Sequence, residues 1–230
     1  MHDSVLLITG ASSGIGAATA RAAAREGYKL VLAARSKEKL TALAHELGPE
    51  NVLTCEVDVT NLEQQQAMVE HALENFGRLD AVFANAGRGG SPGGFSDADH
   101  EAWREMILTN VYGVGLTIQA CLPALKRRKG HVLLTGSAAG RTTIPGSMYS
   151  ATKWAVTGIG YNLREELRGT GMRVTLIEPG MVDTPFFNEP PDYALEDRDI
   201  ANAVVYALSQ PPHVDVNEIL IRPTPPVEKE

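Results

Sequence analysis

A glycine-rich turn between an apolar run and a helix constrains the fold of this chain more than any other feature. Residues 4–9 (SVLLIT) form the apolar run, residues 10–16 (GASSGIG) form the turn, and AATARAAAREG follows with a helical composition. Glycines at such a turn let the backbone approach a pyrophosphate closely, and the helix that follows offers free N–H groups to the anion. The strand-turn-helix setting therefore predicts a dinucleotide site, with a plain tight turn as the alternative.

Further apolar runs alternate with helical stretches along the whole chain. This alternation implies right-handed crossovers and a mainly parallel sheet of seven strands with helices on both faces, a doubly wound α/β fold. A length of 230 residues, 43% of them hydrophobic, fits one domain over residues 1–230, with a loose tail at 221–230. We expect strands at 4–9, 28–34, 51–57, 79–84, 131–135, 172–177 and 216–221, and helices at 37–47, 61–76, 95–129, 147–167 and 196–209.

Composition excludes several classes of partner. The net charge is -7, and the one basic cluster, residues 126–129, ends a predicted helix, where cations complement the helix dipole. We therefore predict no nucleic-acid partner. No run approaches the ~20 apolar residues of a membrane span, and the first residues lack a signal pattern. Cys55 and Cys121 have no metal-ligand spacing, so we expect no metal and a reduced, cytoplasmic protein.

Polar or glycine-rich residues follow each predicted strand. Because ligands of open α/β sheets bind at the carboxyl ends of the strands, all these residues are expected to face one crevice. They are the turn at 10–16, Arg35, Asp58, Asn85-Ala86-Gly87, Ser137, Pro179-Gly180 and Thr184.

Tyr149 and Lys153 lie four residues apart in the predicted helix 147–167, so they share one helical face. An ammonium one turn from a phenol favours the phenolate, and the pair predicts a tyrosine pKa moved toward neutrality. The pattern alone has low specificity, because it also fits a surface Tyr and Lys on an ordinary amphipathic helix. Ser137 supplies a second hydroxyl that would converge with Tyr149 on a reacting oxygen.

Together these motifs resemble the short-chain dehydrogenase/reductase family over nearly the whole chain. The turn reads TGASSGIG, matching that family's T-G-x-x-x-G-x-G, and Asn85-Ala86-Gly87 and the Y-S-A-T-K run at 149–153 match as well. The resemblance implies carbonyl–alcohol interconversion with a nicotinamide cofactor. It implies catalytic roles for Asn110, Ser137, Tyr149 and Lys153, and cofactor contacts for Gly10, Ser12, Ser13, Gly14, Ile15, Gly16, Arg35, Asp58, Val59, Asn85, Ala86, Gly87, Tyr149, Lys153, Pro179, Gly180, Val182 and Thr184.

Cofactor preference rests on Arg35. The family's acidic position, which would accept from a ribose 2′-OH, matches Ala34, and the guanidinium of Arg35 suits a 2′-phosphate, so we expect NADP(H) over NAD(H). The alternative is that Arg35 is an ordinary strand-end residue, capping or solvated, with Lys37 and Lys39 balancing Glu38.

Two further functions compete with the oxidoreductase. A non-catalytic NADP sensor of the same fold would keep the turn, and an epimerase or dehydratase would carry a longer C-terminal portion. Neither accounts for the Ser137, Tyr149 and Lys153 set in a chain of this length.

The substrate and the assembly are left open. The short segment after Thr184, with Phe186 and Phe187, predicts a small lid, and an acidic partner for Arg88 or Arg141 is a hypothesis beside plain solvation. The C-terminal HVDVNEILIRPT resembles members acting on hydroxy acids, serine-type substrates or small ketones. Trp103, Trp154 and Tyr161, with the family resemblance, predict a homo-oligomer, a tetramer or a dimer.

Overall fold

A seven-stranded, wholly parallel sheet forms the centre of the computed structural model, which describes residues 3–90, 92–186 and 191–224. Its order is β3-β2-β1-β4-β5-β6-β9, with the switch in strand order between β1 and β4. This confirms the predicted doubly wound α/β fold. The strands are β1 (Val5–Thr9), β2 (Lys29–Ala34), β3 (Val52–Glu56), β4 (Ala81–Ala84), β5 (His131–Thr135), β6 (Arg173–Pro179) and β9 (Glu218–Ile221).

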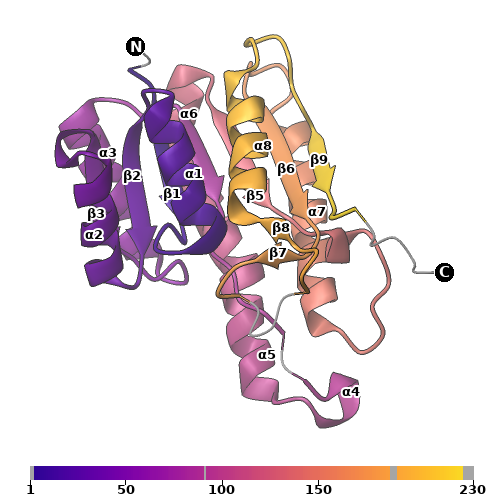
Figure 1. Ribbon diagram of the computed structural model, residues 1–230. Helices are drawn as coiled ribbons and strands as arrows, with labels where there is room; N and C mark the ends of the chain where they lie inside the picture. The colour runs from indigo at the N-terminus through magenta and orange to yellow at the C-terminus, as the bar shows by residue number, and fades with distance from the viewer. Residues whose placement is uncertain (1–2, 91, 187–190, 225–230) are drawn as a thin grey trace.

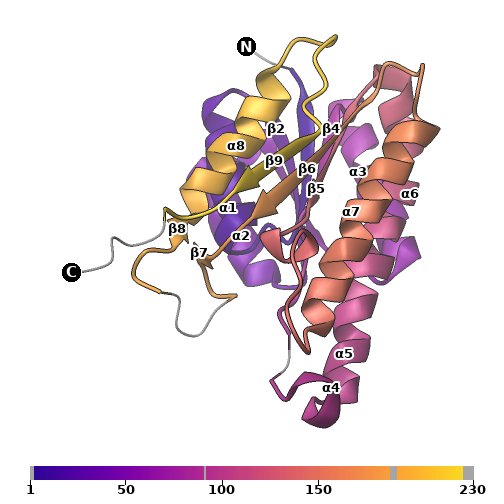
Figure 2. The ribbon, with the colours of Figure 1, turned by 90° about the vertical axis from the view of Figure 1, so that its right-hand side faces the viewer.

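Helices cover both faces of the sheet (Figures 1 and 2). One face carries α1 (Gly14–Arg25), α2 (Lys37–Leu47) and α8 (Asp197–Ser209), and the other carries α3 (Leu62–Phe76), α6 (Gly113–Arg128) and α7 (Met148–Glu166). The strands alternate between the two cores: Leu6 and Leu30 pack under the first set of helices, Leu7 and Val31 under the second. All four side chains are fully buried, each worth roughly 1.5–3 kcal/mol of apolar burial.

Helix ends follow the expected residues in most cases. Asn61 caps α3 by accepting from the Gln64 amide, and Ser147 caps α7. Gly77 ends α3 in the left-handed region, at φ 72°. Ser36 precedes α2 as predicted, but its hydroxyl makes no capping bond.

The single long helix predicted over residues 95–129 is wrong at its start. Gly94–Asp97 forms a separate short helix, α4, and Asp99 caps a new helix, α5 (His100–Ile107). A π-helical segment, Leu108–Tyr112, then joins α5 to α6, and it contains Asn110. The helix is widened locally at Asn110, whose side-chain amide bonds groups outside the helix.

By length and composition the helical stretch His100–Arg128 would be long and apolar enough to cross a membrane. Here its apolar face packs on the sheet and on α3 and α7, which is the position of a core helix.

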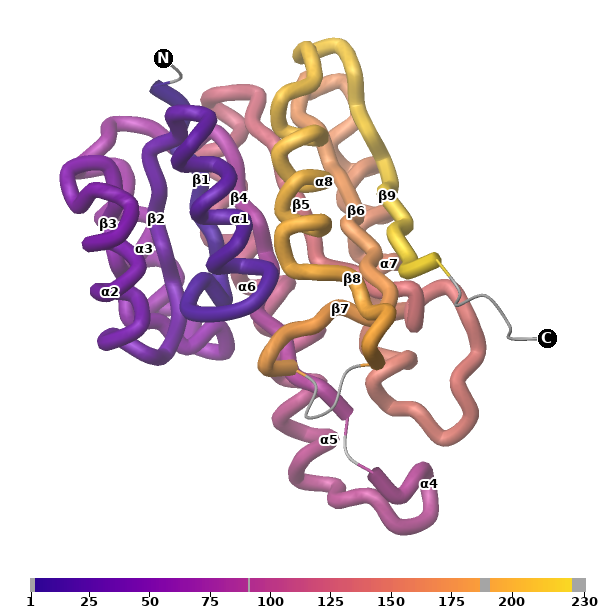
Figure 3. Tube along the Cα trace, in the orientation of Figure 1, coloured from indigo at the N-terminus to yellow at the C-terminus, as the bar shows by residue number. Residues whose placement is uncertain are grey.

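The segments that follow the strands gather at one end of the sheet (Figure 3). They include a 3-10 turn, Ala138–Gly140, and a small sheet of β7 (Val182–Asp183) and β8 (Leu195–Glu196), which the sequence did not predict. Strand β6 also continues through Glu178 and Pro179, two residues beyond its predicted end. Residues 225–230 of the predicted loose tail lie outside the described residues.

Candidate active site

A cavity of about 890 Å³ lies at the carboxyl ends of the strands, large enough for a dinucleotide and a small substrate. Its β1–β3 end is lined by residues from 10–15, 34–39 and 57–60, and its β5–β6 end by residues from 135–144 and 179–186 with the start of α7. Every predicted site residue except Gly16 and Asn110 lines it: Gly10, Ser12, Ser13, Gly14, Ile15, Arg35, Asp58, Val59, Asn85, Ala86, Gly87, Ser137, Tyr149, Lys153, Pro179, Gly180, Val182 and Thr184.

The glycine turn has the shape of an anion cradle. Gly10 and Gly14 have φ of 65° and 48°, a region that side chains rarely occupy. Ser13 precedes α1, and its side chain makes no capping bond. The first N–H groups of the helix therefore do not donate to the Ser13 side chain. Gly16 lies beneath the turn, where a Cβ would overlap the carbonyl oxygen of Gly10. Its role in the fold is close packing, which explains why it does not line the cavity.

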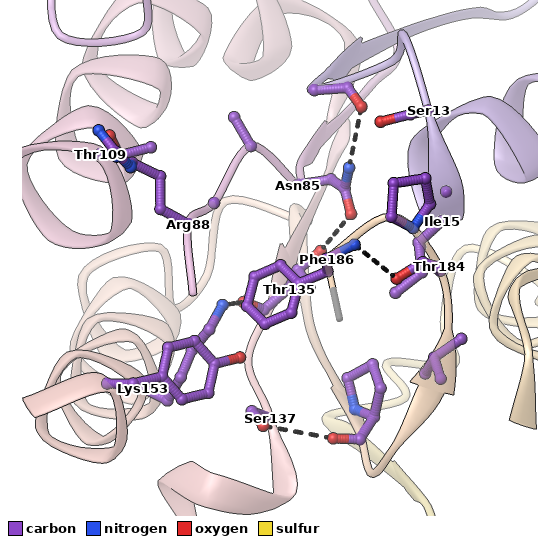
Figure 4. A pocket seen from close by; sticks show the side chains of 18 of the residues that line it. Ser13, Ile15, Asn85, Arg88, Thr109, Thr135, Ser137, Lys153, Thr184 and Phe186 are labelled. Atoms are coloured by element: carbon purple, nitrogen blue, oxygen red, sulfur yellow. Dashed lines mark hydrogen bonds between the residues drawn. The ribbon is translucent and has the colours of Figure 1, made fainter. Parts of the chain in front are cut away.

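Asn85 ties three strand ends together at the switch point (Figure 4). Its side-chain nitrogen donates to the Thr9 carbonyl at 3.1 Å, and its side-chain oxygen accepts from the Thr135 hydroxyl at 3.1 Å. The Thr9 hydroxyl accepts from the backbone of Asn85 and Ala86 at 3.0 and 3.2 Å. Sequence reasoning missed both threonines, although each ends a strand.

At the β1–β3 end, Asp58 accepts from the Thr60 amide and hydroxyl at 2.9 and 2.8 Å. These bonds, with the nearby Arg35, hold the pKa of Asp58 below its usual value. Arg35 and Lys39 are both exposed and line the same end. Sequence reasoning missed Lys39. The sequence did carry a signal for it: a cation in the first turn of α2 opposes the helix dipole, which favours a binding role over a stabilising one.

At the β5–β6 end, α7 places Tyr149 and Lys153 on one face, as predicted. The Ser137 hydroxyl donates to the Pro179 carbonyl at 3.3 Å, and its proximity to the Tyr149 phenol acts to lower the pKa of that phenol. Lys153 is 5% exposed, and its Nζ donates to the Thr135 carbonyl at 2.8 Å. Ser137, Tyr149 and Lys153 are thus brought together at the cavity wall.

The predicted fall in the Tyr149 pKa is wrong for this structure. Burial raises the pKa of Tyr149 to about 12, and the Ser137 hydrogen bond opposes that rise only in part. Burial also lowers the pKa of Lys153 to about 8. The reason is desolvation: both groups lie inside the protein, and the ammonium donates to the Thr135 carbonyl, with Nζ 5.7 Å from the phenol ring centroid.

Asn110 lies behind the cavity and is 1% exposed. Its amide accepts from the Arg88 amide at 2.8 Å and donates to the Arg88 carbonyl at 3.0 Å and to the Thr152 hydroxyl at 3.1 Å. It therefore fixes the segment that follows Asn85–Gly87 against α7, next to Lys153.

Both arginines considered for an acidic substrate have carboxylate partners within the chain. Arg141 contacts the fully buried Glu178 at 2.8 Å and also pairs with Glu218, so it joins the turn after Ser137 to β6 and β9. Arg88 pairs with Glu105, and both line the cavity. Plain solvation, the alternative for these residues, does not describe them either.

Phe186 belongs to the predicted lid, of which residues 187–190 lie outside the described part of the chain. Its ring centroid lies 5.6 Å from that of Tyr149, which places an apolar wall beside the phenol. Phe187 lies outside the described residues.

Comparison with known proteins agrees with this geometry. The family model described as short chain dehydrogenase matches residues 4–192. An uncharacterized oxidoreductase of Staphylococcus aureus (strain USA300) is 44% identical over 228 residues, covering 97% of this chain and 98% of the relative.

Solved structures show the same likeness. The alcohol dehydrogenase of the archaeon Thermococcus sibiricus, complexed with 5-hydroxy-NADP, superposes with a TM-score of 0.90 at 37% identity, covering 99% of each chain. A closed form of serine dehydrogenase complexed with NADP+ superposes with a TM-score of 0.89 at 32% identity, covering 94% of each chain. The chain therefore belongs to the short-chain dehydrogenase/reductase family and is an NAD(P)-dependent oxidoreductase.

Proposed function

We propose that this enzyme interconverts a carbonyl compound and an alcohol with NADP(H), using Tyr149 as general acid and base. The observation that carries the proposal is that Ser137, Tyr149 and Lys153, the last one turn along α7 from Tyr149, line the same wall of a dinucleotide-sized cavity. The cofactor, when bound, supplies or accepts the hydride.

The side chains at the β5–β6 end supply the rest of the chemistry. Ser137 and Tyr149 donate to the substrate oxygen, and Tyr149 gives up its proton in the reductive direction and takes it back in oxidation. Lys153 sets the electrostatics around the phenol. Asn110, which holds Thr152 and the Arg88 backbone beside Lys153, is proposed to anchor a water path from Lys153 to solvent.

Each part of a nicotinamide dinucleotide has residues suited to it. We assign the glycine turn at 10–16 to the pyrophosphate and the Asn85–Gly87 backbone to the centre of the site. Asp58 and Val59 are assigned to the adenine, Lys153 to the nicotinamide ribose, and Val182 and Thr184 beside Pro179-Gly180 to the carboxamide.

A preference for NADP(H) is supported by the exposed Arg35 and Lys39 at the β1–β3 end. Ala34 stands where an acid would otherwise accept from the ribose 2′-OH, and a guanidinium matches a phosphate in charge and shape. The Thermococcus enzyme, 37% identical, was solved with an NADP derivative.

The test is NADPH oxidation, followed optically, against aldehydes, ketones and keto acids, with NADH in parallel. We expect turnover of at least one carbonyl class and a higher kcat/KM with NADPH. Tight NADPH binding by fluorescence, with no turnover of any compound and no oxidation of alcohols, would instead support the sensor function.

We also propose a homo-oligomer, a tetramer or a dimer. Trp154 and Tyr161 on α7 are 48% and 44% exposed, which is unusual for large aromatic groups of a monomer. Trp103 supports this less, because it packs edge-to-face on Phe95. Light scattering at micromolar concentration is expected to give a multiple of 24.7 kDa, and a stable species of that single mass would contradict it.

The cytoplasm is the compartment we propose. Among the described residues Cys55 and Cys121 are free cysteines, as is usual in a reducing environment.

A further inference from the structure

Large apolar side chains are exposed around the Ser137–Tyr149 pair. Ile144, Met181 and Phe186 are 42%, 38% and 39% exposed, and all three line the cavity. They come from two separate segments, the loop before α7 and the segment after β6. Exposed apolar groups that gather at the mouth of a cavity mark a surface for an apolar ligand.

The apolar wall lies directly beside the proton donor. The Phe186 ring is tilted 58° against that of Tyr149, and it also covers Gly89, where a Cβ would lie 3.4 Å from the ring. A group attached to the reacting carbon must therefore contact hydrocarbon.

The cations nearby are already neutralised. Arg88 is paired with Glu105, and Figure 4 shows it reaching toward Thr109, away from Ser137. Arg141 is held by Glu178 and Glu218 and does not line the cavity. A substrate carboxylate would lose its hydration without gaining a free arginine among the described residues at this end, since Lys153 donates to the Thr135 carbonyl and is assigned to the cofactor ribose, and it would also meet the charge of Glu105.

We propose, on the basis of the function given above, that the substrate is an uncharged ketone or aldehyde with an aromatic or branched aliphatic substituent, or the corresponding alcohol. In reduction, the carbonyl carbon gains a hydride from NADPH, the C=O π pair moves to oxygen, and the Tyr149 proton completes the alcohol. The substituent lies against Ile144, Met181 and Phe186. The Arg88–Glu105 pair acts as a specificity determinant, because Glu105 keeps the Arg88 guanidinium from pairing with a substrate carboxylate.

A matched pair of compounds tests the class. Acetophenone and benzoylformate share the phenyl ketone and differ by a methyl group against a carboxylate. We expect kcat/KM with NADPH to be at least about tenfold higher for acetophenone. Equal or better use of benzoylformate, or oxidation of serine in preference to 1-phenylethanol, would overturn the proposed substrate class while leaving the oxidoreductase function intact. Failure to turn over any carbonyl, with NADPH bound, would overturn the function itself and the substrate class with it.

Two variants test the residues. Phe186→Ala is expected to raise the KM for acetophenone about tenfold, with the KM for NADPH little changed, and Phe186→Leu is expected to recover most of the loss. Tyr206→Ala, which removes an exposed aromatic on α8 outside the cavity lining, is the control.

Glu105→Gln leaves Arg88 without its carboxylate, so kcat/KM for benzoylformate is expected to rise about tenfold relative to acetophenone. Glu101→Gln, one turn earlier on α5 and outside the cavity lining, is the matched control. An unchanged ratio in Glu105→Gln would show that Arg88 is not a specificity determinant.

Discussion

The two ends of the cavity differ in what they are made of. The β1–β3 end consists of backbone and exposed side chains: the glycine turn, Ser13, and the cations Arg35 and Lys39. The β5–β6 end is built around buried polar groups. Lys153 is 5% exposed, and behind it lie Asn110 and Glu178, at 1% and 0%.

Because of this difference, we expect substitutions at the β1–β3 end to change cofactor affinity and substitutions at the β5–β6 end to change the stability of the fold as well. Exposed side chains at the β1–β3 end contribute little to the free energy of unfolding, because their charges are solvated in the folded as in the unfolded protein. Charges at the β5–β6 end are desolvated in the folded protein, so the same groups that carry the chemistry also determine how stable the fold is. Four substitutions test the comparison.

Tyr149→Phe is expected to have the largest effect, a fall in kcat of about a thousandfold, because general acid catalysis contributes roughly 10²–10⁴. The ring still packs against Phe186, so the Kd for NADPH should remain within a few-fold of the parent value. Steady-state rates with a parallel fluorescence titration check this. Turnover near the parent level would mean that another group supplies the proton.

Arg141→Met is expected to lower the free energy of unfolding by about 3 kcal/mol, since it leaves the Glu178 carboxylate buried without its cation. Adding Glu178→Leu should recover much of that loss. Arg104→Met, which breaks the exposed pair with Glu101, should cost less than about 1 kcal/mol. Urea unfolding gives all three values, and equal losses for the two single variants would contradict the buried-charge account.

Lys153→Met is expected to impair turnover but to stabilise the fold by up to about 3 kcal/mol at pH 7. The pKa of Lys153 is lowered from 10.5 to about 8, and each unit corresponds to about 1.4 kcal/mol. Between those two values the unfolded chain binds a proton that the folded protein does not, so parent stability rises with pH across this window. The variant should lose that rise, whereas Lys37→Met should keep it. A parent curve that is flat from pH 8 to 10.5 would contradict the shift.

Arg35→Ala is expected to have the smallest effect, a ten- to hundredfold loss of preference for NADPH over NADH, from a charge-assisted contact worth about 1.5–3 kcal/mol. The unfolding free energy should change by less than about 0.5 kcal/mol. Lys37→Ala, which removes a nearby cation at the first residue of α2 and outside the cavity lining, is the control. The ratio of kcat/KM values with the two cofactors decides. If the ratio does not change, Lys39 is the residue to replace next.

The elements of the fold were predictable because their signals are local. Apolar runs predicted seven strands within a few residues of their observed limits, and the helices predicted to begin at residues 61 and 147 begin one residue later, after the caps Asn61 and Ser147. The helix predicted to begin at residue 95 begins at His100 instead. The side chain of Asp99 caps it there, and the apolar pattern from which the helix was predicted does not mark caps.

Site residues were predictable where a strand end or a helical spacing dictates position. The residues predicted to follow each strand line one cavity, and Tyr149 and Lys153 share one face of α7. The sequence did not predict Lys39, Glu105 or Ile144 as cavity residues. They lie on α2, on α5 and in the loop before α7, and only tertiary contacts bring these elements to the same cavity.

The sequence by itself determined the succession of strands and helices along the chain and the chemical groups at the strand ends. Both follow from residue type and periodicity along the chain. Only the tertiary structure decided the ionisation of those groups and their partners. The pKa of Tyr149 rises and that of Lys153 falls because the surrounding elements exclude water, and Arg88 and Arg141 meet Glu105 and Glu178 across the fold. Desolvation and charge pairing depend on distances in space between residues far apart in the chain, and no local pattern in the sequence records them.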